Sequence, residues 1–201
     1  MASDTQIANL ALNHLGIGKE IQNLTTDTSD EATACRRFYE IARDILFRDF
    51  NWPFATKIVA LDLIEEDPNE EWDFSYRYPT DCLRTIKILS GTRNDSHQNR
   101  VPYKISNDTS GLVIYTDTES AELEYVMRIT NPDLFTQDFT MALSFKLANL
   151  ISPRVTAGDP FKLGDRAMQQ YILTASRAMA NAVNEEQPDQ IVESEFIRAR
   201  E

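Results

Sequence analysis

The sequence is poor in the residues from which catalytic and metal sites are most often built, with two histidines and two cysteines among 201 residues. His14 falls on the apolar face of a predicted helix, and His97 lies in a polar loop without a second ligand at metal-binding spacing. No phosphate-binding glycine loop, Gly-x-Ser-x-Gly motif or His-Glu-x-x-His motif occurs. The sequence therefore predicts neither an enzyme nor a bound cofactor or metal ion.

Paired cysteines and long apolar runs are also lacking. Cys35 and Cys82 stand far apart, and buried, reduced thiols are favoured over a disulfide between them. No apolar run approaches the roughly 18 residues that a membrane-spanning helix needs. The N-terminus lacks the basic and apolar regions of a secretory signal. We therefore expect a protein of the cytoplasm that does not enter a membrane.

Positive charge is in deficit, because 20 lysines and arginines face 32 acidic residues and give a formal net charge of −12. Nucleic-acid binding needs a positive surface that attracts phosphates, so this balance argues against it. An acidic surface suits a protein that must not adhere to nucleic acid, although solubility alone also accounts for it. The apolar share of 42% is sufficient for the core of one domain.

Helical periodicity predicts two helices near the start of the chain. Ser3 or Asp4 caps the first, and Gly16 follows its end. The second runs over about 30–50, with apolar residues at helical spacing. The Trp52-Pro53 pair then turns the chain into a strand, because proline cannot continue a helix and favours extended geometry in the residue before it.

The apolar period changes to two in the middle of the chain, as is typical of strands. Short strands between turn-rich segments predict an antiparallel meander, with candidates at 57–63, 72–78, 83–89, 101–105, 111–115 and 121–129. The acidic segment 65–73 is predicted to be a solvated turn. Its carboxylates could hold a divalent cation, but it lacks the alternating ligands and the glycine of an EF-hand loop.

Helical period returns after Pro132, with one helix from about Phe139 to the segment 152–160 and another over about 161–185. The order of elements predicts an α+β fold: a four-helix bundle with an inserted antiparallel β-lobe between helices two and three and an extended C-terminal arm. We assign the bundle to 1–53 and 131–187, the lobe to 54–130 and the arm to 188–201.

Two segments suggest binding. The alternating aromatics Trp72, Phe74, Tyr76 and Tyr78 are expected to fill a core between sheet and bundle. The alternative is a soluble ligand-binding or regulatory α+β domain with its site at this Trp72–Tyr78 face. A hydrolase with a carboxylate-bound divalent metal is the least favoured hypothesis. The arm 188–201 has too few apolar residues to fold alone, and such segments often become ordered on a partner.

Several short motifs occur in one order between about residues 8 and 180. They include Ala11-Leu12-x-His14-Leu15-Gly16, Cys35-Arg36-Arg37-Phe38-Tyr39, Trp52-Pro53-Phe54-Ala55, Tyr78-Pro79-x-Asp81-Cys82-Leu83-Arg84 and Asn131-Pro132-Asp133-Leu134-Phe135. This ordered series resembles the head–tail adaptor proteins of short-tailed bacteriophages, often called tail tubular protein A, and their prophage relatives.

The resemblance implies a structural protein of the virion, assembled in the host cytoplasm. It implies a homo-oligomeric ring, a dodecamer in most of the family, between the portal protein of the capsid and the tail nozzle protein. Duplex DNA would pass through the ring during ejection without sequence-specific binding. The family's C-terminal arm docks on the portal, so the expected portal-binding residues are Ile191, Phe196, Ile197, Arg198 and Arg200.

Four arginines of the second helix are expected to form contacts between subunits of such a ring. They cannot all find partners within their own helix, and the chain has a large excess of acidic residues. These residues are Arg36, Arg37, Arg43 and Arg48.

Overall fold

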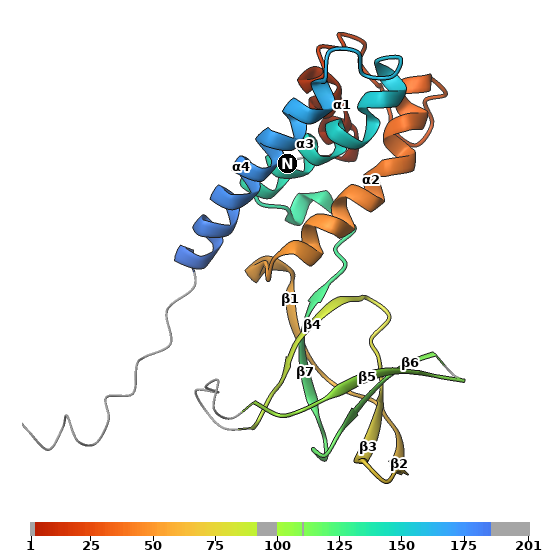
Figure 1. The fold of residues 1–201 in the computed structure, drawn as a ribbon, viewed down its shortest axis with the longest axis vertical. Coiled ribbons are helices and arrows are strands. Elements are labelled where there is room, and N and C mark those ends of the chain that lie inside the picture. The colour runs from red at the N-terminus through yellow and green to blue at the C-terminus, as the bar shows by residue number, and fades with distance from the viewer. Residues whose placement is uncertain (1–2, 92–99, 110, 186–201) are drawn as a thin grey trace, which may run out of the picture.

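The computed structural model describes residues 3–91, 100–109 and 111–185. In this part of the chain four α-helices lie at one end and two antiparallel sheets at the other (Figure 1), so the predicted α+β class is confirmed. The helices are α1 (Asp4–His14), α2 (Asp30–Asp49), α3 (Gln137–Val155) and α4 (Leu163–Glu185). All the described strands fall between α2 and α3 in the sequence.

The first two helices begin at serine caps. Ser3 and Gln6 form a capping box, in which the Ser3 hydroxyl accepts from the Gln6 N–H at 3.2 Å and Gln6 Oε1 accepts from the Ser3 N–H at 3.0 Å. The Ser29 hydroxyl accepts from the Ala32 N–H at 3.3 Å. Gly16 has φ +74°, a conformation that favours glycine after a helix end. These local signals explain why both helices begin where the sequence predicts.

Helix α3 lies at the centre of the helical part and packs against α1, α2 and α4 (Figure 1). The His14 ring of α1 stacks on Phe145 with 3.8 Å between ring centroids, and its Nε2 lies 3.0 Å from the Ser144 hydroxyl. Burial lowers the pKa of His14, which favours the neutral ring in this stack. His14 is therefore a packing residue.

The turn between α3 and α4 depends on one carboxylate. Asp159 has φ +57°, and its two side-chain oxygens accept from the N–H groups of Leu163 at 2.7 Å and Gly164 at 2.8 Å. A Cβ on Gly164 would lie 2.9 Å from Asp159 Oδ2, so glycine is required for this close approach. The carboxylate satisfies N–H groups that the first turn of α4 cannot pair within the helix.

The strands form two sheets. One has the order β1 (Thr56–Ala60), β7 (Glu122–Met127), β4 (Cys82–Ile88), and the other β2 (Leu63–Asn69), β3 (Trp72–Arg77), β6 (Gly111–Thr116), β5 (Lys104–Asp108). The predicted meander is wrong, because β7 lies between β1 and β4, and β6 lies between β3 and β5. Two small sheets can pack their apolar faces against each other. In a single meander of these strands, one apolar face would remain exposed to solvent.

The acidic segment is a strand and not a turn up to Asn69. β2 pairs with β3, with Asn69 opposite Trp72, and only 70–71 form the hairpin loop. Asn69 Oδ1 accepts from the N–H groups of Glu71 at 2.9 Å and Trp72 at 3.1 Å. Backbone pairing with the aromatic strand stabilises β2 while most of its side chains remain exposed, so the acidic composition did not indicate its structure.

Strand β7 belongs to two hydrophobic cores. Val126 is buried in the core that the helices share, whereas Leu123 and Tyr125 are buried in a second core between the two sheets. The same strand pairs with β1 on one side and β4 on the other. It therefore connects the helical part to the sheets through side chains on both of its faces.

The corner at Trp52 fixes where the chain leaves α2. Trp52 is 1% exposed, and its Nε1–H donates to the Leu46 carbonyl at 2.8 Å. Its ring meets Phe139 of α3 edge-on, with 5.1 Å between centroids. Pro53 begins the 3-10 turn η1 (Pro53–Ala55), which leads directly into β1. The predicted helix-to-strand corner is confirmed.

Replacing Trp52 by alanine is expected to reduce the free energy of unfolding by about 3–5 kcal/mol, because the change opens a cavity between α2 and α3. Trp52→Phe keeps most of the ring but leaves the Leu46 carbonyl without this donor, and should cost about 1–3 kcal/mol. Urea titrations followed by circular dichroism measure both values. A loss below 1 kcal/mol for Trp52→Ala would show that the corner is not an important packing site.

Candidate interaction surfaces

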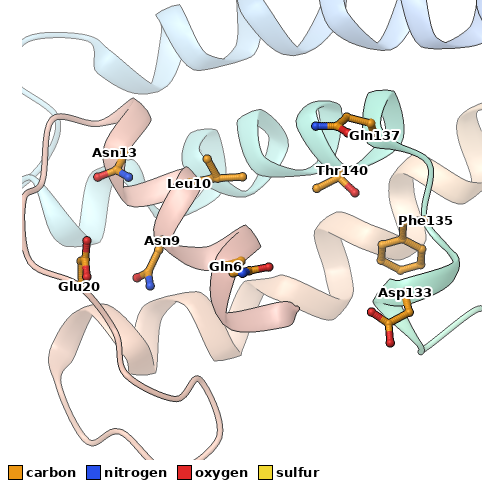
Figure 2. Close-up of a pocket in the computed structure, with 9 residues that line it drawn as sticks. All are labelled: Gln6, Asn9, Leu10, Asn13, Glu20, Asp133, Phe135, Gln137 and Thr140. Atoms are coloured by element: carbon orange, nitrogen blue, oxygen red, sulfur yellow. The ribbon is translucent and has the colours of Figure 1, made fainter. Parts of the chain in front are cut away.

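A pocket of about 570 Å³ opens beside α1 (Figure 2). We call it the α1 pocket, and nine residues line it: Gln6, Asn9, Leu10, Asn13, Glu20, Asp133, Phe135, Gln137 and Thr140. The four from α1 follow the spacing i, i+3, i+4 and i+7, which places them on one helix face. The sequence predictions did not include this pocket.

Local hydrogen bonds hold the first wall of the α1 pocket. Asn9 Nδ2 donates to the Ile21 carbonyl at 2.9 Å, and Asn9 Oδ1 accepts from the Ile21 N–H at 2.8 Å. This pairing ties the segment after α1 back onto the helix. Glu20 is consequently held at the edge of the pocket, next to Ile21 in the chain.

The second wall comes from the segment that leads into α3. Asn131 Oδ1 accepts from the Asp133 N–H at 3.1 Å in the 3-10 turn η3 (Pro132–Leu134). The Phe135 ring packs on Phe47, at 5.8 Å between centroids, and on Phe139 at 4.9 Å. Asp133 and Phe135 therefore occupy fixed positions opposite α1, although more than a hundred residues separate them from it in the sequence.

The chemistry of the α1 pocket is mixed. Four carboxamides and one hydroxyl line it, together with two carboxylates and the apolar side chains of Leu10 and Phe135. Thr140 is only 9% exposed, and its hydroxyl has no hydrogen-bond partner among the described residues. The pocket can therefore offer several oxygen acceptors beside an apolar surface.

The predicted aromatic face mostly forms core, but this core lies between the two sheets and not, as predicted, between the sheet and the helices. Tyr76 is 2% exposed and donates its hydroxyl to the Thr118 carbonyl at 2.8 Å, while Phe74 packs against the same core between the sheets. Tyr78 also packs against this core and lines a cavity of about 240 Å³ beside Lys57 and Asp81. The alternative ligand site at this face is thus largely filled by the protein's own side chains.

The four arginines of α2 differ in their surroundings. Arg36 donates to the carbonyls of Thr25 at 3.0 Å and Asp27 at 2.6 Å, which ties the preceding loop to the helix. Arg43 is buried and forms an ion pair with Asp44 at 3.0 Å. Arg37 and Arg48 are exposed, and neither side chain has a hydrogen bond or ion pair in the described part of the chain.

Two of the four predicted contact residues thus already have partners within the subunit. Sequence reasoning considered partners only along one helix and missed the carbonyls of the loop before it. Arg37 and Arg48 remain available to a neighbour. The arm residues Ile191, Phe196, Ile197, Arg198 and Arg200 lie outside the described residues, as does His97.

An apolar surface that the sequence predictions did not include follows the outer side of α4. Ile172 and Leu173 are each 53% exposed and Val183 is 55% exposed. Residues 166–184 contain no Asp or Glu, although the chain as a whole is strongly acidic. Three exposed apolar side chains along a helix segment without carboxylates can contribute to a contact surface. On α2, Ile41 is 50% exposed and lies four residues after Arg37 and seven before Arg48, on the same side of the helix.

The described residues offer no activated thiol. Cys35 is free and buried, and burial raises the pKa of its thiol to about 12. Cys82 is free and half-buried, and burial raises its pKa as well. Among the residues that the structure describes, no group of three or more His, Cys, Asp or Glu side chains is placed to hold a metal ion. No described helix is both long and apolar enough to cross a membrane.

Comparison with known proteins assigns no family: no protein-family model matches the chain, and no curated protein matches it.

Cys35 is expected to resist thiol reagents in the folded protein. An ordinary thiol becomes largely thiolate by pH 9, whereas Cys35, with its pKa raised to about 12, stays protonated and enclosed. A Cys82→Ser variant should therefore react with Ellman's reagent only after unfolding in guanidinium, at pH 7 and pH 9 alike. Rapid reaction of the folded variant at either pH would contradict the burial of Cys35.

Proposed function

We propose that this chain is a structural adaptor of a bacteriophage virion. It forms a homo-oligomeric ring, of about twelve copies as in the family that its motifs resemble, and the ring joins the portal protein to the tail nozzle protein. Duplex DNA passes through the lumen during ejection. In this proposal 1–53 and 131–187 form a four-helix bundle, 54–130 an inserted β-lobe and 188–201 a portal-binding arm.

The observation that carries the proposal is the placement of the motif residues at the junction between helices and sheets. Trp52 packs between α2 and α3, as described above. Arg84 of β4 donates to the Arg48 carbonyl at the end of α2 at 3.0 Å and to the Asn51 side chain. A cation at this position also suits the negative end of the helix dipole.

A second motif residue, Asp81, secures the return of the chain. Its carboxylate accepts from the Tyr125 hydroxyl at 2.8 Å, and its backbone carbonyl accepts from the Arg128 N–H at 2.7 Å. Burial and Asp81 raise the pKa of Tyr125, so its hydroxyl remains a donor. Motifs that fix the angle between two parts of a subunit suit a connector, whose task is to hold other proteins in a set geometry.

The helical part also offers two different outer surfaces. Figure 1 shows α2 and α4 on either side of α3. One surface is the apolar face of α4 around Ile172 and Val183, and the other is the side of α2 with Ile41, Arg37 and Arg48. A cyclic ring requires that one surface of each subunit meets a different surface of the next. These two faces are suitable for that contact.

The charge of the chain fits a DNA channel. A net charge of −12 weakens adhesion to phosphates, so duplex DNA can slide past without being held. The alternative function, a soluble ligand-binding or regulatory domain with its site at the Trp72–Tyr78 face, has less support because Phe74 and Tyr76 are core residues.

The ring is tested by size-exclusion chromatography with light scattering and by negative-stain microscopy, on the protein alone and with its portal. Ile172→Lys with Val183→Lys should abolish rings without changing the melting temperature, because each new cation would be desolvated at the contact opposite Arg37 and Arg48. Ile105→Lys with Leu112→Lys, at exposed apolar positions of the sheets, is the matched control and should leave rings intact. A monomer under both conditions for the unaltered protein would refute the proposal.

Truncation after Gln187 is expected to leave the melting temperature unchanged and to abolish portal binding. Ile191, Phe196 and Ile197 could each contribute about 1.5–3 kcal/mol when buried in a groove of the portal. Repetition around a ring would strengthen a weak contact. Co-sedimentation with portal rings measures the effect, with Ser194→Ala as the control. Full portal binding by the truncated protein would show that another surface docks.

A further inference from the structure

We propose that the α1 pocket binds the basic side chains of an extended segment of a partner polypeptide. This inference is independent of the adaptor role. Both ionisable residues that line the pocket, Glu20 and Asp133, are acidic, and no cation lines it. Lys19, the neighbour of Glu20 in the chain, forms an ion pair with Glu31 at 2.6 Å and so is already engaged. The local charge therefore favours a cationic occupant.

The uncharged polar groups of the pocket suit the N–H donors of arginine or lysine. The amides of Asn13 and Gln137 have no hydrogen bond among the described residues, so their carbonyl oxygens can accept. Thr140 is only 9% exposed, and its buried hydroxyl lacks a partner in the described part of the chain. It lies beneath the pocket wall, so the accessible acceptors are the carboxamides and the two carboxylates.

The apolar part of the pocket suits the stem of a basic side chain. Arginine and lysine bury their methylene groups along apolar surface while the charged head contacts polar groups. Leu10 and Phe135 supply such surface, and a guanidinium can also lie over the Phe135 ring. Contacts with Phe47 and Phe139 hold that ring in place before any ligand arrives.

The layout of the carboxylates favours an extended segment with two basic residues. Figure 2 shows Glu20 and Asp133 at opposite ends of the row formed by Asn13, Leu10, Asn9 and Gln6. From Gln6 to Asn13 a helix rises roughly 10 Å, about the length of three residues of extended chain. An extended segment that follows this row would therefore bring one basic side chain towards each carboxylate.

The test uses the full chain and the fluorescein-labelled peptide Gly-Arg-Ala-Arg-Gly, with binding measured by fluorescence anisotropy. Glu20→Gln with Asp133→Asn should weaken binding about tenfold, because two exposed ion pairs are lost. Glu65→Gln with Glu66→Gln changes the charge equally on β2, away from the pocket, and should leave the affinity unchanged. A peptide with citrulline in place of both arginines should likewise bind about tenfold more weakly. In ¹⁵N spectra, the side-chain amide signals of Asn13 and Gln137 should shift on titration with the arginine peptide.

Several results would overturn the proposal. Equal weakening by both double variants would show general attraction to an acidic protein, and equal binding of the citrulline peptide would exclude recognition of charge. Binding that appears only after truncation at Gln187 would assign the pocket to the chain's own Arg198 and Arg200 instead of a partner. Melting temperatures of all variants, measured in parallel, separate loss of binding from loss of fold.

Discussion

The rest of the structure depends on the aromatic packing that closes around Trp52. The chain leaves the helical part at this residue and returns to it through Ile129 and Phe135, so both crossings must be held in one place. Trp52 meets Phe139 edge-on, and Phe135 packs on the same ring from the returning segment. Such aromatic pairs stabilise by about 0.5–1.5 kcal/mol beyond the area they bury. They therefore help to fix the orientation of the sheets relative to the helices.

Polar contacts reinforce this joint from its outer side. Asp44 of α2 lies between Arg43, its neighbour in the helix, and Arg128, which follows β7 and approaches it at 3.0 Å. The segment that returns from β7 continues past Asn131, and its residues Asp133 and Phe135 form one wall of the α1 pocket. The same short stretch of chain thus contributes both to the shape of that pocket and to the orientation of the sheets.

Local signals made the helices predictable, and non-local pairing limited what else the sequence could reveal. The cap at Ser3 or Asp4 and Gly16 predicted the ends of α1, apolar spacing predicted the span of α2, and Trp52-Pro53 predicted the corner. The predicted meander was wrong because alternation of apolar and polar residues identifies a strand but not the strand it pairs with. The position of β7 between β1 and β4 is an example. The acidic composition of β2 predicted a solvated turn, although its backbone pairs with β3. Arg36 was predicted to contact a neighbouring subunit, but it donates to two carbonyls of the loop before α2. The α1 pocket was out of reach because Asp133 and Phe135 meet α1 only in the folded chain.

The pairing of β1 with β7 has a consequence for the order of folding and for sequence divergence. Thr56 lies opposite Val126, so the first and last described strands between α2 and α3 pair with each other and bring the ends of this segment together. Once that ladder forms, α2 and α3 are joined by a short effective loop, and the entropy of bringing them together is small. Of the β2-β3-β6-β5 sheet, Tyr76 and Ile114 share a core with Leu123 and Tyr125 of β7, so these positions are tied to the closure. Its exposed positions, such as Ile105 and Leu112, can change without altering the closure or the docking of the helices.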